Sequence, residues 1–174
     1  MFEQGYVQIF TGDGRGKTSA ALGTSLRVLG NGGKVFFAQF IKGREVSSEF
    51  HALAAFGTHF EHHMFGKGRF IKGKPDGDDL AFAEKGLRKC ALALSSGDYN
   101  LVVMDELNGA VSCGLLNVKD VLEMIKLRNS RTELVITGRG AHPELVAVAD
   151  LVSDIVPVKH YYEKGVKARR GIEF

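Results

Sequence analysis

Residues 6–23 read YVQIFTGDGRGKTSAALG. The first five residues are mostly apolar and β-prone, and three glycines follow within the next seven residues before an alanine-rich stretch begins. A strand that runs through a glycine-rich turn into a helix is the context in which a phosphate-binding P-loop occurs. The glycines allow successive backbone N–H groups to surround an anion, and the start of the helix adds positive dipole. The stretch therefore predicts a phosphate site at residues 11–19.

Two side chains of this turn carry the chemistry that phosphate binding needs. We expect Lys17 to add a full positive charge and Thr18 to offer its hydroxyl group to Mg²⁺. The general pattern has a glycine where this chain has Thr11, so the motif is shifted by one glycine. A glycine-rich turn without a ligand is the alternative, and it is disfavoured because Gly-Lys-Thr directly after a strand is a specific signal.

Strand-like apolar segments alternate with segments of helical periodicity along the whole chain. Strands are expected at residues 6–10, 34–40, 58–63, 100–105, 133–137 and 151–157. Helices are expected at residues 17–29, 46–56, 78–95, 118–129 and 143–149. Strands that are apolar on both faces are typical of parallel sheets covered by helices on both sides. We therefore predict an α/β chain with a three-layer P-loop (RecA-like) fold, a mostly parallel central sheet and a single domain over residues 1–174.

Composition excludes several classes of protein. The 174 residues are 44% hydrophobic and 25% charged, which is ordinary for a globular protein. The longest apolar runs hold five residues, far below the roughly 18 that a membrane span needs, and the N-terminus does not read as a secretory signal. We therefore expect no membrane partner and a cytoplasmic location. A net charge of +3 is too small to indicate a nucleic-acid partner.

Two further strand ends are expected at the edge of the sheet that carries the phosphate loop. The strand at 101–104 is followed by Asp105 and Glu106, and a carboxylate there can hold Mg²⁺ directly or through water. The strand at 134–136 leads into Arg139, whose planar guanidinium suits phosphate oxygens. An exposed arginine between two turn glycines is the alternative for Arg139. Position alone favours a surface role for Arg27.

Five segments, in order, resemble the corrinoid adenosyltransferases of the CobA/BtuR type, also written CobO. They are TGDGRGKTSAALG at 11–23, QFIKG at 39–43, VVMDELN at 102–108, VITGRGAHPELVAVADLVSDI at 135–155 and VKHYYEKGVKARRGIEF at 158–174. The last two are highly specific, because ordinary P-loop NTPases do not carry them in this order. The shifted P-loop is normal in this family.

The resemblance implies an enzyme of adenosylcobalamin biosynthesis or salvage. It would transfer the 5′-deoxyadenosyl group of ATP to the Co(I) of cob(I)alamin or cob(I)yrinic acid a,c-diamide, with release of triphosphate. It also implies a homodimer and a partner reductase that supplies electrons.

The resemblance also implies the roles of individual residues, with Lys17, Phe70 and Arg139 as catalytic residues. The metal would be Mg²⁺, served by Thr18 and Glu106. Nucleotide phosphates would contact Gly12, Asp13, Gly14, Arg15, Gly16, Lys17, Thr18, Ser19, Arg27 and Arg139.

The stretch 65–79 reads FGKGRFIKGKPDGDD and predicts a long loop, because four glycines and a proline do not suit a regular element. Members of the family lift the lower axial ligand of cobalt away with an aromatic wall, which makes Co(II) easier to reduce. The resemblance therefore makes Phe70 the candidate for this wall and Phe65 the second candidate. The family commonly has another aromatic residue, often Trp, two positions further on, and this chain has no Trp.

Other interpretations stay open from the sequence. A phosphotransferase or ATP hydrolase would use the same P-loop, with Glu106 orienting a nucleophile at the γ-phosphate. A carrier would bind nucleotide or corrinoid without reaction. His59, Glu61 and His63 alternate on an expected strand and could bind a metal, although no further ligand is evident. Cys90 lies on an apolar helical face, which favours a buried thiol.

Overall fold

A parallel sheet forms the centre of the protein in the computed structural model, which describes residues 2–41, 47–68 and 73–173. Over these residues the sheet has six strands in the order β3-β2-β4-β5-β1-β6, and every neighbouring pair is parallel. The strands are β1 (Val7–Thr11), β2 (Val35–Phe40), β3 (Phe60–Phe65), β4 (Leu101–Asp105), β5 (Glu133–Thr137) and β6 (Leu151–Asp154). Parallel pairing brings their carboxyl ends to one edge.

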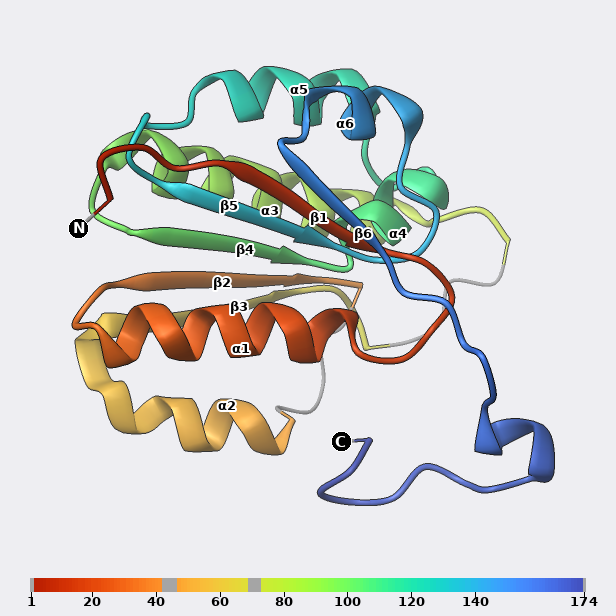
Figure 1. Ribbon diagram of the computed structural model, residues 1–174. Helices are drawn as coiled ribbons and strands as arrows, with labels where there is room; N and C mark the ends of the chain where they lie inside the picture. Colours follow the sequence, from red (N-terminus) through yellow and green to blue (C-terminus); the bar gives the residue numbers. More distant parts are fainter. Residues whose placement is uncertain (1, 42–46, 69–72, 174) are drawn as a thin grey trace.

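Helices cover both faces of this sheet, as Figure 1 shows. One face carries α1 (Lys17–Gly30) and α2 (Ser48–Leu53), which bury Phe37, Val103 and Val135 beneath them. The other face carries α3 (Gly77–Ser96), α4 (Leu107–Ser112), α5 (Val118–Lys126) and α6 (Pro143–Val148). The central strands are buried on both faces, which explains their continuous apolar runs. The expected three-layer α/β fold is confirmed.

Several helix ends follow from local sequence signals. The α3 helix begins with a capping box in which Asp76 and Asp79 each accept a hydrogen bond from the other's backbone N–H. Asn117 caps α5 through the backbone N–H of Lys119, and Pro143 occupies the first turn of α6. The sequence did not predict α4, because six residues that include a glycine give no readable helical period.

The expected boundaries are wrong by two or more residues at four places, one of which is the expected helix 118–129, because α5 ends at Lys126. Residues 54–59 form a 3₁₀ segment, η1 (Ala54–His59), so the expected helix 46–56 is shorter and β3 starts two residues late. The expected strand 151–157 ends at Asp154. The later register of β3 places Phe65 inside the strand, 4% exposed, with its ring 6.0 Å from that of Phe40. Phe65 therefore packs in the core, and its alternative assignment to the corrinoid wall is wrong.

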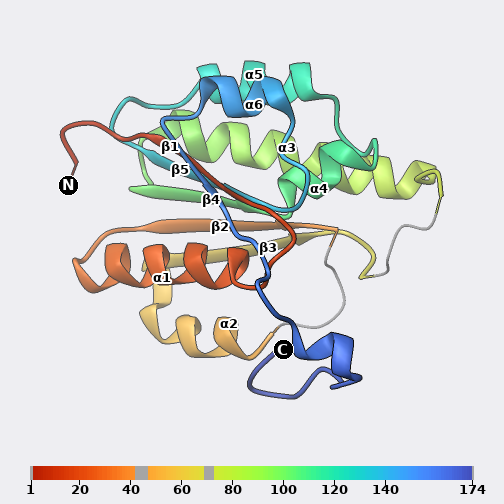
Figure 2. The same cartoon turned by 45° about the vertical axis from the view of Figure 1, so that its right-hand side comes forward.

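The chain after β6 runs across the carboxyl edge of the sheet in front of the phosphate loop, as Figure 2 shows. It includes a second 3₁₀ turn, η2 (Tyr161–Lys164). The backbone N–H of Gly14 donates to the carbonyl of Ile155 at 2.7 Å. A Cβ atom on Gly14 would lie 2.6 Å from that same oxygen, so this close approach requires glycine. Within the described residues, no helix is long and apolar enough to cross a bilayer.

Candidate active site

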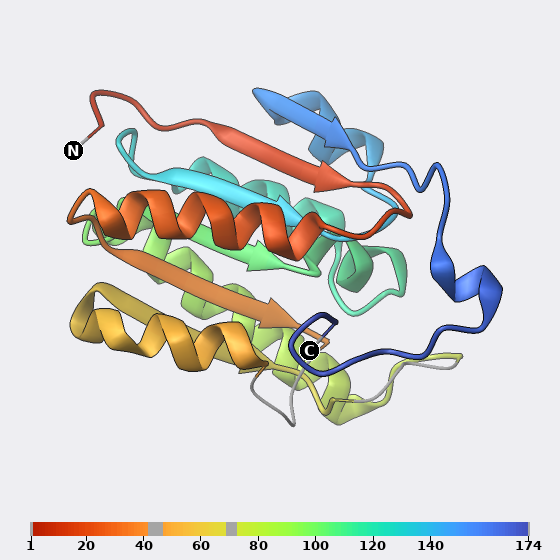
Figure 3. The same ribbon diagram turned by 60° about the horizontal axis from the view of Figure 1, so that its bottom comes forward.

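The phosphate loop joins the end of β1 to the start of α1 (Figure 3). Lys17 is the first residue of α1 and is only 8% exposed. Its Nζ donates to the carbonyl oxygens of Gly12 and Gly14, each at 2.7 Å. Burial lowers the pKa of Lys17 below its ordinary value, and the carboxylate of Glu106 opposes this shift. A bound anion would offset the burial of this charge, as a phosphate site requires.

Asp105, at the end of β4, is fully buried beneath this loop. Its Oδ1 accepts hydrogen bonds from Thr18 Oγ1 at 2.8 Å and from Thr137 Oγ1 at 2.6 Å. Its Oδ2 accepts from Gln39 Nε2 at 2.9 Å. Because the proton of Thr18 points to Asp105, the lone pairs of its hydroxyl oxygen are left for another partner, such as a metal ion. Sequence reasoning missed Gln39 and Thr137, although both lie in the segments QFIKG and TGRG.

Glu106 has the left-handed backbone conformation, with φ at 62°, and it lies between β4 and α4. This conformation is uncommon for residues other than glycine and is often found at functional sites. A hydrogen bond of 3.0 Å from its N–H to Thr137 Oγ1 supports it. The side chain lines the same cavity as Thr18, so the structure brings the two expected metal-binding residues together.

This cavity has a volume of about 940 Å³, at the upper end of the usual range for small-molecule sites. Its floor is the P-loop, one wall is the start of α2, and another wall is the C-terminal segment. The lining residues are Asp13, Gly14, Arg15, Gly16, Lys17, Thr18, Ser19, Leu22, Ser47, Ser48, Glu49, Glu106, Arg139, His160, Tyr161, Gly171, Ile172 and Glu173. Of the residues expected to contact nucleotide phosphates, the lining therefore holds those from Asp13 to Ser19 and Arg139, but not Gly12.

Two expected arginines differ in position. Arg139 lies at the mouth of the cavity, where its Nε is 3.7 Å from Asp13 Oδ1 and its Nη2 donates to the Asp13 carbonyl at 3.4 Å. Arg27 is an exposed residue in the last turn of α1. Ten residues of helix separate it from Lys17, a rise of about 15 Å. The structure does not bring Arg27 to the cavity, so its expected phosphate contact within this chain is not supported.

Polar side chains of the C-terminal segment close one side of the cavity. Arg15 Nη2 donates to the carbonyl of Ile172 and lies 3.9 Å from Glu173 Oε1. The carboxylate of Glu173 also accepts hydrogen bonds from the Tyr161 hydroxyl and from Arg169. These contacts, from Arg169 first and Tyr161 second, lower the pKa of Glu173 to about 2. Sequence reasoning missed this wall, although Glu173 is part of the specific GIE ending.

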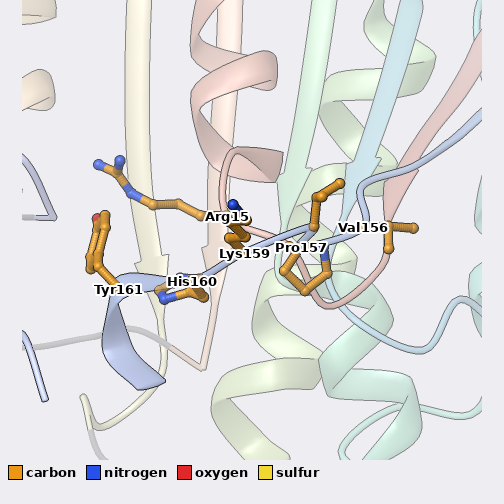
Figure 4. A pocket seen from close by; sticks show the side chains of 8 residues that line it. Arg15, Val156, Pro157, Lys159, His160 and Tyr161 are labelled. Carbon is orange, nitrogen blue, oxygen red and sulfur yellow. The ribbon is translucent and has the colours of Figure 1, made fainter. Parts of the chain in front are cut away.

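A smaller cavity of about 360 Å³ lies between the P-loop and the C-terminal segment. Figure 4 shows Arg15 extending from the loop toward the side of the Tyr161 ring, with Lys159 and His160 nearby. Arg15 and Tyr161 line both cavities. The two cavities therefore meet at the contact between the loop and the C-terminal segment.

Phe70 lies outside the described residues, and the other candidates do not line the cavity. Glu61 is hydrogen-bonded to His63 and also accepts a hydrogen bond from the Tyr99 hydroxyl. These two contacts, from His63 first and Tyr99 second, lower the pKa of Glu61. Within the residues that the structure covers, no three His, Cys, Asp or Glu side chains gather as metal ligands, so the structure does not support the metal interpretation of this strand. Cys90 is fully buried, and burial raises its pKa, as expected for an inert thiol.

The parallel sheet, the P-loop and the hydrogen bond from Thr18 to Asp105 define a P-loop nucleotide-binding protein of the α/β class. A solved structure of similar fold is the flagellar accessory protein FlaH from Methanocaldococcus jannaschii. It matches with a TM-score of 0.63 over 87% of this chain and 71% of that chain. Sequence identity is 13%, so this likeness concerns the fold alone.

The sequence defines the family. The family described as ATP:corrinoid adenosyltransferase BtuR/CobO/CobP matches residues 3–174. The corrinoid adenosyltransferase of Pseudomonas aeruginosa is 38% identical over 99% of this chain and 85% of its own length. The corrinoid adenosyltransferase CobA of Salmonella typhimurium is 35% identical over 99% of this chain and 87% of its own length. This chain belongs to the corrinoid adenosyltransferase family, whose members are transferases.

Proposed function

We propose that this enzyme transfers the 5′-deoxyadenosyl group of ATP to the Co(I) of a reduced corrinoid. Co(I) attacks the 5′ carbon of the ribose, so a cobalt–carbon bond forms and the bond from that carbon to the α-phosphate oxygen breaks. Triphosphate leaves with the electron pair of the broken bond. Cob(I)alamin and cob(I)yrinic acid a,c-diamide are both proposed acceptors.

The P-loop cavity carries this proposal together with the family match. A triphosphate leaving group needs its developing negative charge stabilised, and it needs no protein base to activate water. We assign this stabilisation to Lys17, to the backbone N–H groups of residues 13–19 and to Arg139. Gln39, the residue of β2 that is paired with Asp105, is an amide whose nitrogen donates to that carboxylate. This position therefore supplies a hydrogen-bond donor and no general base.

We also propose that the nucleotide binds with Mg²⁺. The donor set fits this ion, because a Thr18 hydroxyl with free lone pairs and the Glu106 carboxylate face one cavity, and Mg²⁺ prefers oxygen ligands. Mg²⁺ would neutralise part of the charge on the phosphate oxygens. Thr18 would ligate it directly, Glu106 directly or through water, and Asp105 would orient Thr18.

The corrinoid side of the proposal concerns Phe70, which lies outside the described residues and is supported by the family resemblance alone. Phe70→Ala should slow the reaction that starts from Co(II) and a reductant. It should spare the reaction that starts from chemically prepared cob(I)alamin, because that substrate needs no reduction. Anaerobic assays with each form of the substrate would measure this difference, and equal losses in both assays would remove the wall role.

Three further properties of the enzyme belong to the proposal. Co(II) corrinoids must be reduced, so we propose a partner reductase that donates one electron. A reducing compartment suits a Co(I) substrate, which supports a cytoplasmic location. We also propose a homodimer, as the family resemblance implies, and sedimentation analysis would test it.

An anaerobic assay tests the central activity. Enzyme, ATP, Mg²⁺ and cob(I)alamin should give loss of the Co(I) absorption spectrum and formation of a light-sensitive cobalt–carbon bond. A carrier would bind both ligands and leave the corrin spectrum unchanged. A hydrolase or phosphotransferase that uses Glu106 would consume ATP without any need for the corrinoid, and corrinoid-independent turnover would therefore contradict the proposal.

A further inference from the structure

A chain of hydrogen bonds leads from the P-loop across β4 and β2 to the edge strand β3. Thr18 donates to Asp105, and Gln39 Nε2 donates to the other oxygen of the same carboxylate. Gln39 Oε1 lies 3.0 Å from His62 Nε2 on β3. These residues come from α1, β4, β2 and β3, and the last three are adjacent strands. We call Gln39 and His62 together the relay.

The hydrogen bonds in this chain have a defined direction. Because the amide nitrogen of Gln39 faces Asp105, its carbonyl oxygen faces His62. An amide oxygen only accepts, so His62 Nε2 carries a proton and donates it to Gln39. Donors therefore converge on Asp105 from the relay as well as from Thr18. The relay thus holds the Asp105 carboxylate in one orientation. In this orientation Thr18 donates its proton to Asp105, and the lone pairs of its hydroxyl oxygen are left for the cavity.

The same relay reaches the opposite wall of the cavity. The His62 ring stacks on Phe50 with the ring centroids 3.8 Å apart and an angle of 9° between planes. Phe50 is 3% exposed and belongs to α2. Ser48 and Glu49, in the first turn of this helix, line the cavity across from the P-loop. A path of partly and fully buried side chains therefore connects the Thr18 hydroxyl with the α2 wall.

We propose that Gln39 and His62 are positioning residues for the metal–nucleotide complex. Neither residue lines the cavity, and Gln39 is 2% exposed, so both act through Asp105 and Phe50 rather than by touching the substrate. Gln39 holds the carboxylate that orients Thr18, and His62 holds Gln39 and α2. This inference rests on the proposed function only in requiring a nucleotide bound with Mg²⁺.

The test measures nucleotide binding, without corrinoid, by calorimetry. Gln39→Met keeps the side-chain volume and removes the amide. It should weaken binding of ATP about tenfold in the presence of Mg²⁺ and less than about twofold in EDTA. The variant loses the hydrogen bond from Gln39 to the buried Asp105 carboxylate, and this carboxylate orients the Thr18 hydroxyl, which binds nucleotide only through Mg²⁺. His62→Phe keeps the stack on Phe50 and should cause a smaller loss, about threefold, again only with Mg²⁺.

Gln8→Met is the matched control, since Gln8 also donates from a strand to a carboxylate, that of Glu133 at 2.6 Å, but Glu133 does not line the cavity. It should leave both affinities unchanged. Equal losses with and without Mg²⁺ in the relay variants, or no loss in either, would overturn the proposal. If Gln39→Met does not fold, as thermal unfolding would show, His62→Phe decides the question by the same comparison.

The outcome separates this inference from the proposed function. A wild-type protein that forms no adenosylated corrinoid, while the relay variants lose Mg²⁺-dependent affinity, would contradict the function and leave the relay in place. An active wild-type protein with relay variants of unchanged Mg²⁺ dependence would contradict the relay alone.

Discussion

The floor and the C-terminal wall of the nucleotide cavity are built in opposite ways. The floor rests on Asp105 and Thr137, both fully buried, and its hydrogen bonds cross between adjacent strands. The wall rests on contacts among Arg15, Arg169 and Glu173, in which both arginine side chains are about half exposed. Hydrogen bonds to buried charges contribute about 1.5–3 kcal/mol each, and exposed ion pairs about 0–1 kcal/mol. The floor should therefore govern catalysis and the wall should only adjust it.

Removal of the charge in the floor should have the largest effect. Lys17→Ala takes away the ammonium that neutralises the triphosphate, and we expect a loss in kcat/KM of at least about 10³-fold. Single-turnover kinetics would measure it, and circular dichroism should show an intact fold. Lys17→Arg is the matched control, because it keeps the charge with a different geometry, and it should recover part of the rate. Near-normal turnover by Lys17→Ala would contradict the assigned site.

Asp105→Asn should have the next largest effect. The amide nitrogen would face one of the three side-chain donors that now converge on this residue, and one hydrogen bond to a buried group would be lost. We expect a loss of about 1–3 kcal/mol in the free energy of unfolding and a weaker response to Mg²⁺. Urea denaturation and an Mg²⁺ titration of activity would measure both. Asp13→Asn, at the exposed mouth, should change the free energy of unfolding by no more than about 0.5 kcal/mol.

The lowered pKa of Lys17 predicts opposite responses to alkaline pH. The unfolded chain keeps the ordinary value of 10.5, so below that pH it binds more protons at this residue than the folded chain does. The contribution of Lys17 to the free energy of unfolding of the ligand-free protein should therefore rise as the pH increases through the window below 10.5. The affinity for ATP should fall over the same window, because the ammonium loses its proton. Lys17→Met should abolish both trends, and a trend that persists in this variant would assign it to other groups.

Change in the wall should have the smallest effect. Glu173→Gln weakens its contacts with Arg15 and Arg169, and we expect a change in the KM for ATP of less than about fivefold. Added salt should change the KM of the wild-type protein in the same direction as the substitution does, because salt screens the same ion pairs. It should change the KM of the variant less, because these pairs are already weakened there. Steady-state kinetics at two ionic strengths would measure this. A loss as large as that of Lys17→Ala would show that the wall, and not the floor, governs catalysis.

Sequence reasoning found the P-loop of the floor because its signals are local. A strand, three glycines and Gly-Lys-Thr specify a P-loop that includes Thr18, and the strand end before Glu106 brings that residue to the same sheet edge. Gln39 and Thr137 could not be assigned in this way, since only the strand order places them beside Asp105. Arg27 has a family match but lies at the far end of α1. The contacts of Glu173 join residues up to 158 positions apart, and no local pattern encodes them.

The account depends on where on ATP the reaction occurs. Phosphorus NMR of a single turnover with reduced corrinoid, ATP and Mg²⁺ tests this directly, because it identifies every phosphate product. We predict intact triphosphate in an amount equal to the adenosylated corrinoid formed. ADP and inorganic phosphate as the first products, with the corrinoid unchanged, would place the reaction at the γ-phosphate and contradict the account.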